Sequence, residues 1–422
     1  MYIYCTVCHI ADMKERTYLD WAAATPLSPT ALAAMLPYLE SQFGNPSAIH
    51  AEGQAGRNAV EAARAQVAQA VQVRPEFVTF TSGGTEGNNL AVFGTIETAT
   101  KGNPSLGIEG RTYDSMAVIT TNIEHPSVSL AMEALEKQGV ELRYVGVTPE
   151  GKIDLVELRE LLDNKVVLLS TAYANSEIGT VQPVHAIRKI LRECEEVNGT
   201  QIMFHLDAAQ APLWLTCQFD TLGADLVTLD AAKCCGPKGV GVLVVSRRAD
   251  LAPTIYGGGQ ERGLRPGTEN VAGIVGAAVA IERAQADWQT RAESVAAVRD
   301  QAIAHILAEL PGAVLNGVSP AKSKGNPSMA VDRVANNINI SIPGLDTEYA
   351  AVVLDMAGFA VSTKSACSGA GGGASTVVLE TTGDLARASA TLRITLGPDS
   401  TLEQLKSLTI VLKQHVVKME NF

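Results

Sequence analysis

Short apolar runs alternate with helix-length segments through the first part of the chain. Seven runs of four to six mostly apolar residues lie at 77–80, 117–120, 142–145, 166–169, 202–206, 225–229 and 240–245. Continuous apolar strands that are joined through helices are typical of a parallel sheet covered on both faces. The pattern therefore predicts an α/β fold, a three-layer sandwich with a mostly parallel central sheet.

Helical patterns flank and separate these runs. Ser28 and Pro29 supply an N-cap and a first-turn proline for a helix that runs to about residue 39. We expect further helices over 54–71, over 184–194, where apolar residues recur at helical spacing, and over 271–310. These helices are long enough to cover the predicted sheet.

The pattern changes after residue 310. Residues 311–335 are rich in Gly, Pro, Ser and Lys, which is typical of an exposed connection. A strand pattern at 337–342 and a helix pattern at 345–356 follow, and the capping box Ser400-x-x-Glu403 predicts the start of a last helix. The chain is thus expected to fold as a flexible leader over 1–14, a large cofactor-binding domain over 15–285, and a smaller C-terminal α/β domain over 286–422.

Composition restricts the class of protein. With 46% hydrophobic residues in 422, the chain can bury a large core, and its net charge of −12 argues against nucleic acid or an anionic membrane as the main partner. No apolar stretch is long enough to span a bilayer, and the first residues lack the order of a signal peptide, so we expect a cytoplasmic protein. Seven cysteines, an odd number, indicate reduced thiols.

The N-terminus carries a C-x-x-C-H motif at Cys5, Cys8 and His9. The motif occurs at haem c attachment sites, which are found in exported proteins, and a C-x-x-C pair also forms half of many zinc sites. No export signal precedes it, and no second C-x-x-C or H-x3-H pair follows. We therefore expect these residues to belong to the leader, and we expect no metal.

Reactive residue types follow the predicted strands. Because ligands of open parallel sheets bind beyond the carboxyl ends of the strands, these residues are expected to meet. Gly84 lies in a glycine pair that opens a helix, where free N–H groups and the helix dipole favour a phosphate. Lys233 follows an apolar run and two alanines, and a desolvated amine is a nucleophile. The constellation is typical of a pyridoxal phosphate site, and it comprises Gly84, Thr85, His125, Asn175, Asp207, Gln210 and Lys233.

Longer motifs lead to a family. The chain contains YLDWAAATPLSP from Tyr18, FGNPSAIH from Phe43, FTSGGTEGNN from Phe80, ANSEIGTVQ from Ala174, HLDAAQ from His205, GPKG from Gly236, GGGQERGLRPGTEN from Gly257, SACSG from Ser365 and LRITLG from Leu392. With these motifs it resembles the cysteine desulfurases of the class V aminotransferase group, over nearly everything after the leader. The resemblance implies a fold-type I pyridoxal 5'-phosphate enzyme with a mobile cysteine loop, which moves sulfur from L-cysteine towards iron–sulfur clusters or thiolation.

The resemblance also implies roles for single residues. Lys233 corresponds to the lysine that links covalently to the cofactor, and Asp207 to the partner of the pyridinium nitrogen. His125 corresponds to the ring stacked on the cofactor, while Gln210 and Asn175 lie near its hydroxyl and the substrate. Gly84 and Thr85 correspond to phosphate ligands.

Three further implications concern the substrate, the sulfur and a second subunit. Arg393 corresponds to the residue that binds the carboxylate of L-cysteine, which suits the fork of a guanidinium. Cys367 corresponds to the sulfur acceptor that forms a persulfide and passes it to an acceptor protein, either a cluster scaffold or a thiolation enzyme. Thr268 corresponds to a ligand of the other subunit's cofactor phosphate, which implies a homodimer with shared sites.

The motif around Lys233 departs from the family pattern. Where the family has Ser-x-His before the lysine, this chain has Asp230 and Ala232, so two donors to the phosphate are replaced. Cys234 and Cys235 replace the usual bulky pair after the lysine, and we expect them to serve packing. Two other functions stay open: a different pyridoxal phosphate reaction, such as selenocysteine lysis or transamination, and a non-catalytic sulfur-relay or scaffold protein.

Overall fold

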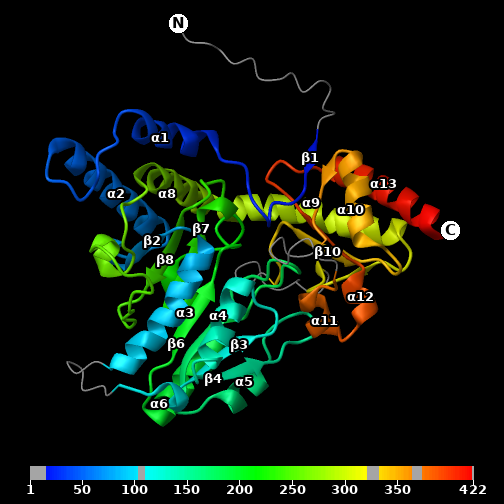
Figure 1. The fold of residues 1–422 in the computed structure, drawn as a ribbon. Coiled ribbons are helices and arrows are strands. Elements are labelled where there is room, and N and C mark those ends of the chain that lie inside the picture. The colour runs from blue at the N-terminus through cyan, green and yellow to red at the C-terminus, as the bar shows by residue number, and fades with distance from the viewer. Residues whose placement is uncertain (1–15, 103–109, 321–331, 364–372, 421–422) are drawn as a thin grey trace, which may run out of the picture.

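A seven-stranded sheet forms the centre of the protein (Figure 1). The computed structural model describes residues 16–102, 110–320, 332–363 and 373–420. The strand order is β2-β8-β7-β6-β5-β3-β4. Only β8 runs antiparallel to its neighbours among these strands. The strands are β2 (Val78–Thr81), β3 (Ala117–Thr121), β4 (Glu141–Val145), β5 (Val166–Ala172), β6 (Met203–Asp207), β7 (Leu226–Asp230) and β8 (Gly241–Val245). All seven predicted strands are confirmed.

Helices cover both faces of this sheet. Ile119 of β3 packs into the larger core cluster, whereas the adjacent Val118 packs into a second cluster on the opposite face. The larger cluster includes residues of α2 (Ala51–Ala70), α5 (Leu155–Leu161), α6 (Val184–Asn198), α7 (Phe219–Leu222) and α8 (Val271–Ala286). The second cluster includes residues of α3 (Gly84–Lys101) and α4 (Pro126–Glu136). This alternation explains why strands buried on both faces appear as continuous apolar runs, and it confirms the predicted three-layer sandwich.

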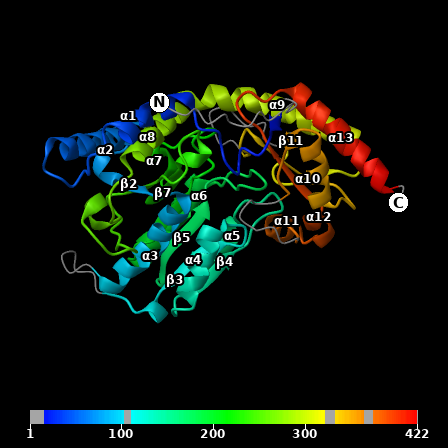
Figure 2. The same ribbon diagram turned by 45° about the horizontal axis from the view of Figure 1, so that its top comes forward.

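A smaller antiparallel sheet follows in the C-terminal part. Its order is β12-β10-β9, from β9 (Val314–Leu315), β10 (Asn337–Ser341) and β12 (Thr391–Thr395). The helices of this part are α9 (Trp288–Glu309), α10 (Thr347–Met356), α11 (Thr376–Thr382), α12 (Leu385–Ser389) and α13 (Leu402–Glu420). Figure 2 shows α9 reaching from the α8 side of the molecule to α13. The predicted limit between residues 285 and 286 falls in the last turn of α8 and remains a prediction.

The N-terminal segment joins the two parts. β1 (Thr17–Tyr18) pairs in parallel with β11 (Phe359–Ala360), and Asp20 continues this contact by a bridge to Thr395. The chain then returns to the large sheet, where α1 (Pro29–Glu40) packs against α8. Residues 19–24 are therefore placed between the two sheets.

Two sequence predictions are corrected. The helix expected over 271–310 is interrupted at Asp287, and Arg291 donates to the carbonyl oxygen of Ala284 in the last turn of α8. The last helix is capped one residue later than predicted: the capping box joins Thr401 and Gln404, each of which receives the other's backbone N–H. The hydroxyl of Ser400 instead accepts from the N–H of Gly397.

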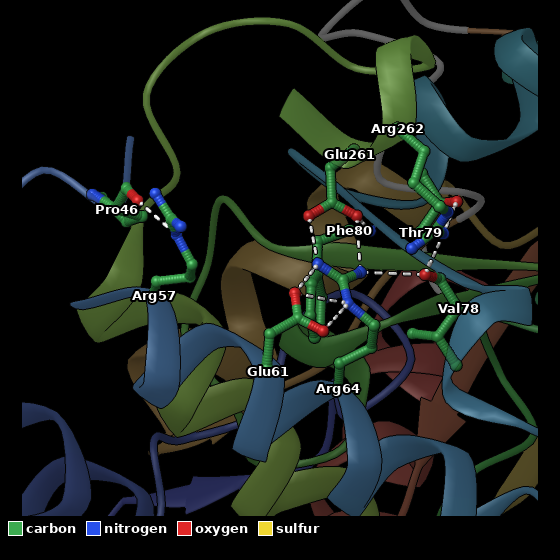
Figure 3. Close-up of polar contacts among 9 residues, drawn as sticks. All are labelled: Pro46, Arg57, Glu61, Arg64, Val78, Thr79, Phe80, Glu261 and Arg262. Carbon is green, nitrogen blue, oxygen red and sulfur yellow. Dashed lines mark hydrogen bonds and ion pairs between the residues drawn. The ribbon is translucent and has the colours of Figure 1, made fainter. Parts of the chain in front are cut away.

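A buried ion pair fixes the loop between β8 and α8 (Figure 3). Both carboxylate oxygens of Glu261 lie 2.7 Å from nitrogens of Arg64, and one of them also accepts from the N–H of Phe80. The side chains of Arg64 and Glu261 are 4% and 2% exposed. Glu261 and Arg262 both adopt left-handed backbone angles, with φ of 46° and 58°. The pair thus holds two non-glycine residues in a conformation that is otherwise unfavourable.

We expect Glu261→Ala to lower the free energy of unfolding by about 3–5 kcal/mol, because it leaves the charge of Arg64 buried without its main partner. Glu61→Ala serves as the control. Glu61 also contacts Arg64, but its side chain is 58% exposed, and the loss there should be below about 1 kcal/mol. Denaturant unfolding of both variants measures the difference. Equal losses would contradict the assignment of the buried pair as the main constraint.

Candidate active site

A cavity of about 270 Å³ lies at the carboxyl ends of the central strands. Most residues of its wall come from the large sheet region, between residues 84 and 233. Ala22 and Ala23 of the N-terminal segment and Val377 and Arg393 of the C-terminal part complete it. The predicted site residues that line it are Gly84, Thr85, His125, Asn175, Asp207, Gln210, Lys233 and Arg393. Eight predicted residues from different elements therefore meet in one place.

Lys233 reaches the cavity from a short 3-10 helix, η4 (Ala231–Lys233), directly after β7. Its amine donates to the carbonyl oxygens of Ala22, at 3.1 Å, and Ala23. Gln210 donates to the same Ala22 oxygen at 3.0 Å. The amine is therefore held at the cavity wall by two backbone carbonyl oxygens.

Asp207 is a buried carboxylate at the end of β6. One of its oxygens accepts from the side-chain amide of Asn88 at 2.8 Å and the other from the N–H of Ala209 at 3.0 Å. Asn88 also donates to the hydroxyl of Ser127, which lies 2.7 Å from Nδ1 of His125. A chain of hydrogen bonds thus connects Asp207 with His125.

His125 caps helix α4 and faces the cavity. Its Nδ1 accepts from the N–H of Ser127 at 3.1 Å, which places the ring proton of the neutral form on Nε2. Burial lowers the pKa of His125; the charge of Asp207 opposes this effect and that of Lys233 adds to it. The ring therefore favours the neutral state in the cavity.

Glu124 joins the ends of β3 and β5 beside the cavity. One carboxylate oxygen accepts from the hydroxyls of Thr121 and Thr171, and the other from the N–H of Ala172 at 2.7 Å. Burial raises the pKa of Glu124 to about 7, against the effect of these donors, and the charge of Asp207 contributes in the same direction. Glu124 directly precedes His125 in the sequence, but no role was predicted for it.

This shift predicts a pH dependence of stability. A carboxyl whose pKa is raised in the folded state binds more protons there than in the unfolded state, so its stabilising contribution is full below the unfolded pKa of about 4.5 and is lost as pH rises through about 7. The loss should be on the order of 3 kcal/mol, at about 1.4 kcal/mol per pKa unit. We expect Glu124→Gln to flatten the stability profile between pH 5 and 8 in denaturant unfolding. Glu136→Gln, at the end of α4, is the control, and a parallel profile for Glu124→Gln and wild type would refute the shift.

Arg393 is fully buried on β12 and lines the far side of the cavity. Its Nη2 donates to Asp20 at 2.8 Å and its Nη1 to the carbonyl oxygen of Ser176 at 3.2 Å. Its Nε has no hydrogen-bond partner among the described residues. A buried guanidinium with an unused donor at a cavity wall fits a small carboxylate.

Asn175 lines the cavity, but its amide serves the surrounding backbone. It donates to the carbonyl oxygen of Ile123 at 2.9 Å and accepts from the N–H groups of Glu177 and Ile178. The residue therefore shapes the wall between the two sheets. This use of both ends of the amide was not expected from the sequence.

The glycine turn before α3 faces the cavity, as predicted, but an internal carboxylate already contacts it. The N–H of Gly84 donates to Asp230 at 3.2 Å, and the N–H of Ala232 donates to the other oxygen of Asp230 at 2.9 Å. Ala232 does not line the cavity. The turn has N–H groups of the kind that bind a phosphate. Asp230, which stands where the family has a serine, places a carboxylate among them.

The remaining predicted residues are one that the structure places elsewhere and one that it does not describe. Thr268 is exposed and does not line it. Cys367 lies outside the described residues, as do Cys5, Cys8 and His9 of the leader. The described residues on either side of the segment 364–372 contact the cavity wall: Ser362 pairs with the backbone of Arg393, and Ser375 donates to Glu177 at 2.6 Å.

Cys234 and Cys235 lie behind Lys233. Cys234 belongs to the hydrophobic core and is 1% exposed, and burial raises its pKa well above the usual value. Cys235 is half-buried and packs against the same core. The expected packing role is thus confirmed, and neither thiol lines the cavity.

Four further residues of the site were missed from the sequence: Asn88, Ser127, Asp20 and Glu177. Asn88 lies one helical turn after Gly84, so the spacing on α3 could have revealed it. Ser127 follows the cap residue of α4 by two positions. Asp20 and Glu177 act through partners 373 and 198 positions away, and no local pattern indicates such pairs.

Neither a metal cluster nor a membrane span is found in the part of the chain that the structure describes. No group of three or more His, Cys, Asp or Glu side chains within it is arranged to hold a metal ion. None of its helices is both long and apolar enough to cross a bilayer.

The sequence and the fold match those of known proteins. The profile of the family described as aminotransferase class-V matches residues 17–408, so the chain belongs to this family. Within it, cysteine desulfurase IscS of Dictyoglomus turgidum (strain DSM 6724 / Z-1310) is 36% identical over 408 residues, or 96% of each chain. The predicted resemblance to cysteine desulfurases is thereby confirmed.

Solved structures agree with this placement. A structure described as a NifS-like protein has a TM-score of 0.83 at 29% identity and covers 95% of this chain and 99% of its own. A second, described as SspA in complex with cysteine, has a TM-score of 0.72 at 29% identity and covers 90% of this chain and 99% of its own. The predicted fold class is therefore confirmed over nearly the full length.

Proposed function

We propose that the protein is a pyridoxal 5'-phosphate-dependent cysteine desulfurase, which converts L-cysteine to L-alanine and transfers the sulfur to Cys367 as a persulfide. The observation that carries this proposal is the meeting of Lys233, Asp207 and Arg393 in one cavity. An amine, a buried carboxylate and a buried guanidinium are the groups needed to hold an aldehyde cofactor and an amino acid together. The membership in a family with many cysteine desulfurases supports it.

The residues fit the cofactor, with Asp230 as the exception. Lys233 would hold its aldehyde carbon, and Asp207 would accept from its pyridine nitrogen. When bound, the cofactor supplies an electron sink that weakens bonds at the substrate α-carbon. The remaining residues proposed to surround it are Gly84, Thr85, His125, Asn175 and Gln210 of the same subunit and Thr268 of a second subunit.

The residues of this chain orient the substrate and move its protons. Arg393 binds the substrate carboxylate, and its contacts to Asp20 and Ser176 fix the guanidinium at the cavity wall. The amine of Lys233, which lies at the same cavity wall, would accept the α-proton at Nζ. The hydrogen bonds from Asn88 and Ala209 hold the carboxylate of Asp207 in place at the end of β6.

Cys367 is proposed to accept the sulfur. Its thiolate attacks the substrate sulfur, an S–S bond forms, the C–S bond breaks, and the carbon takes up protons to leave alanine. The balance is L-cysteine plus the Cys367 thiol giving L-alanine plus the Cys367 persulfide, without an external oxidant. Ser362 and Ser375, on either side of residues 364–372, contact residues that line the cavity, and this supports the proposed reach of Cys367.

A homodimer with shared sites and an external sulfur acceptor complete the proposal. Thr268 is exposed on the loop that Glu261 and Arg64 hold, which suits a contact with a second subunit. The acceptor would be a cluster scaffold or a thiolation enzyme, and the location the cytoplasm. These features rest on the family resemblance more than on single contacts.

Incubation of the purified, cofactor-loaded protein with L-cysteine tests the proposed function. We expect alanine and protein-bound persulfide in equal amounts in a single turnover. Transfer of the amino group to a keto acid would indicate an aminotransferase, and alanine formation from selenocysteine alone would indicate a lyase. Absence of any product and of any visible absorption would favour the non-catalytic scaffold.

A further inference from the structure

The start of helix α3 contains a carboxylate where an anionic ligand would otherwise bind. Asp230, the last residue of β7, places one carboxylate oxygen 3.2 Å from the N–H of Gly84 and the other 2.9 Å from the N–H of Ala232. N–H groups at a helix start, together with the helix dipole, attract anions. The side chain of Asp230 is therefore an internal anion bound at this turn.

The pairing of the strands brings Asp230 close to the turn before α3. Gly241 of β8 pairs with Thr81 of β2 on one side and with Asp230 of β7 on the other. A Cβ atom at Gly241 would lie 2.5 Å from the carbonyl carbon of Gly83, so only glycine lets the turn approach the strand this closely. A Cβ atom at Gly84 would in turn lie 3.3 Å from the carboxylate of Asp230. The contact is thus built into the packing of β2, β8 and β7.

The same turn faces the cavity that holds Lys233. Gly84, Thr85 and Asp230 all line it. A phosphate monoester carries a charge of about −1.5 to −2 at pH 7, so it would meet a like charge at this position. Like charges at close range disfavour each other's ionised form and weaken binding.

We propose that Asp230 is an internal competitor of the cofactor phosphate, so that this protein gains unusually little affinity from the phosphate group of its cofactor. The proposal rests on the proposed pyridoxal phosphate site. The covalent link to Lys233 is common to pyridoxal phosphate and to unphosphorylated pyridoxal. A comparison of the two ligands therefore isolates what the phosphate contributes.

The test is a binding cycle on the full-length protein stripped of cofactor. Pyridoxal phosphate and pyridoxal are each titrated into wild type and Asp230→Asn, with visible absorption as the readout. We expect Asp230→Asn to bind pyridoxal phosphate at least about tenfold more tightly, as removal of a like charge implies, and to bind pyridoxal within about twofold of wild type. An unchanged preference for the phosphorylated ligand, or a weaker one, overturns the proposal.

A variant at the cap of another helix distinguishes competition between Asp230 and phosphate from the mere loss of a helix cap. Asp346 caps α10 by accepting from the N–H of Tyr349 at 3.0 Å, and α10 does not line the cavity. Asp346→Asn should lower the thermal stability of the stripped protein without changing the ratio of the two affinities. If this control shifts the ratio as much as Asp230→Asn, the effect is one of stability, and the proposal fails.

Inorganic phosphate distinguishes this inference from the proposed function. It should raise the melting temperature of stripped Asp230→Asn more than that of stripped wild type, whether or not an aldehyde ligand attaches to Lys233. If neither pyridoxal ligand attaches but phosphate behaves in this way, the proposed function fails and the role of Asp230 stands. If phosphate affects both proteins equally, the role of Asp230 is refuted even in an active enzyme.

Discussion

Lys233→Ala is expected to abolish alanine formation from L-cysteine and to remove the visible absorption of the cofactor-loaded protein. Lys233 is the lysine whose amine lies at the wall of the cavity that also contains Asp207 and Arg393. On the proposed function, the variant would lack both the covalent link to the cofactor and the acceptor of the substrate α-proton. A decrease in turnover of at least about 10³-fold is the expected size, because both roles end together.

Lys238→Ala is the matched control for this variant. Lys238 lies five positions later, and its amine donates to the carbonyl oxygen of Thr25 at 3.0 Å outside the cavity. Its removal should leave absorption and turnover close to wild type. Retention of alanine formation in Lys233→Ala, or equal losses in the two variants, would exclude Lys233 as the cofactor lysine.

Much of the fold was predictable because a buried strand appears in the sequence as a short apolar run. Strands that are covered on both faces are mostly apolar, because Val118 and Ile119, for example, pack into clusters on opposite sides of β3. Residues that follow such strands share one edge of the sheet, so Asp207 and Lys233 could be placed together before any contact was known. Their roles came from motif resemblance.

The contacts between distant segments were not predictable in this way. Asp20 meets Arg393 across 373 positions and Glu261 meets Arg64 across 197, and neither pair has a periodic signature. Asp230 was recognised as a departure from the family pattern, but only the structure shows that its carboxylate receives two backbone N–H groups. Such pairs form between distant chain segments that are brought together by the packing of the sheets.

Helix ends were predicted less accurately than helices. The sequence from Ser400 offers two overlapping capping boxes, Ser400 with Glu403 and Thr401 with Gln404. The structure uses the second, and the hydroxyl of Ser400 binds the N–H of Gly397 instead. Tertiary placement of the preceding turn therefore selects between two caps that are equivalent by sequence.

Cys367→Ser is expected to separate cofactor chemistry from sulfur transfer. The variant should bind the cofactor and L-cysteine as wild type does, because Lys233, Asp207 and Arg393 are unchanged. It should form no persulfide, and alanine formation should fall at least about 10²-fold, because a serine hydroxyl is a poor nucleophile towards sulfur at neutral pH. Absorption changes on addition of L-cysteine and mass spectrometry of the protein measure the two effects.

Cys194→Ser tests whether any other thiol substitutes for Cys367. Cys194 lies on α6 away from the cavity and accepts a hydrogen bond from Asn198 at 3.1 Å, and burial raises its pKa. A thiol of this kind is a weak nucleophile, so the variant should form the persulfide at the wild-type rate. If Cys367→Ser releases sulfide and alanine as fast as wild type, the protein removes sulfur without an enzyme-bound persulfide. The selenocysteine lyase type of reaction would then describe the site better than desulfuration.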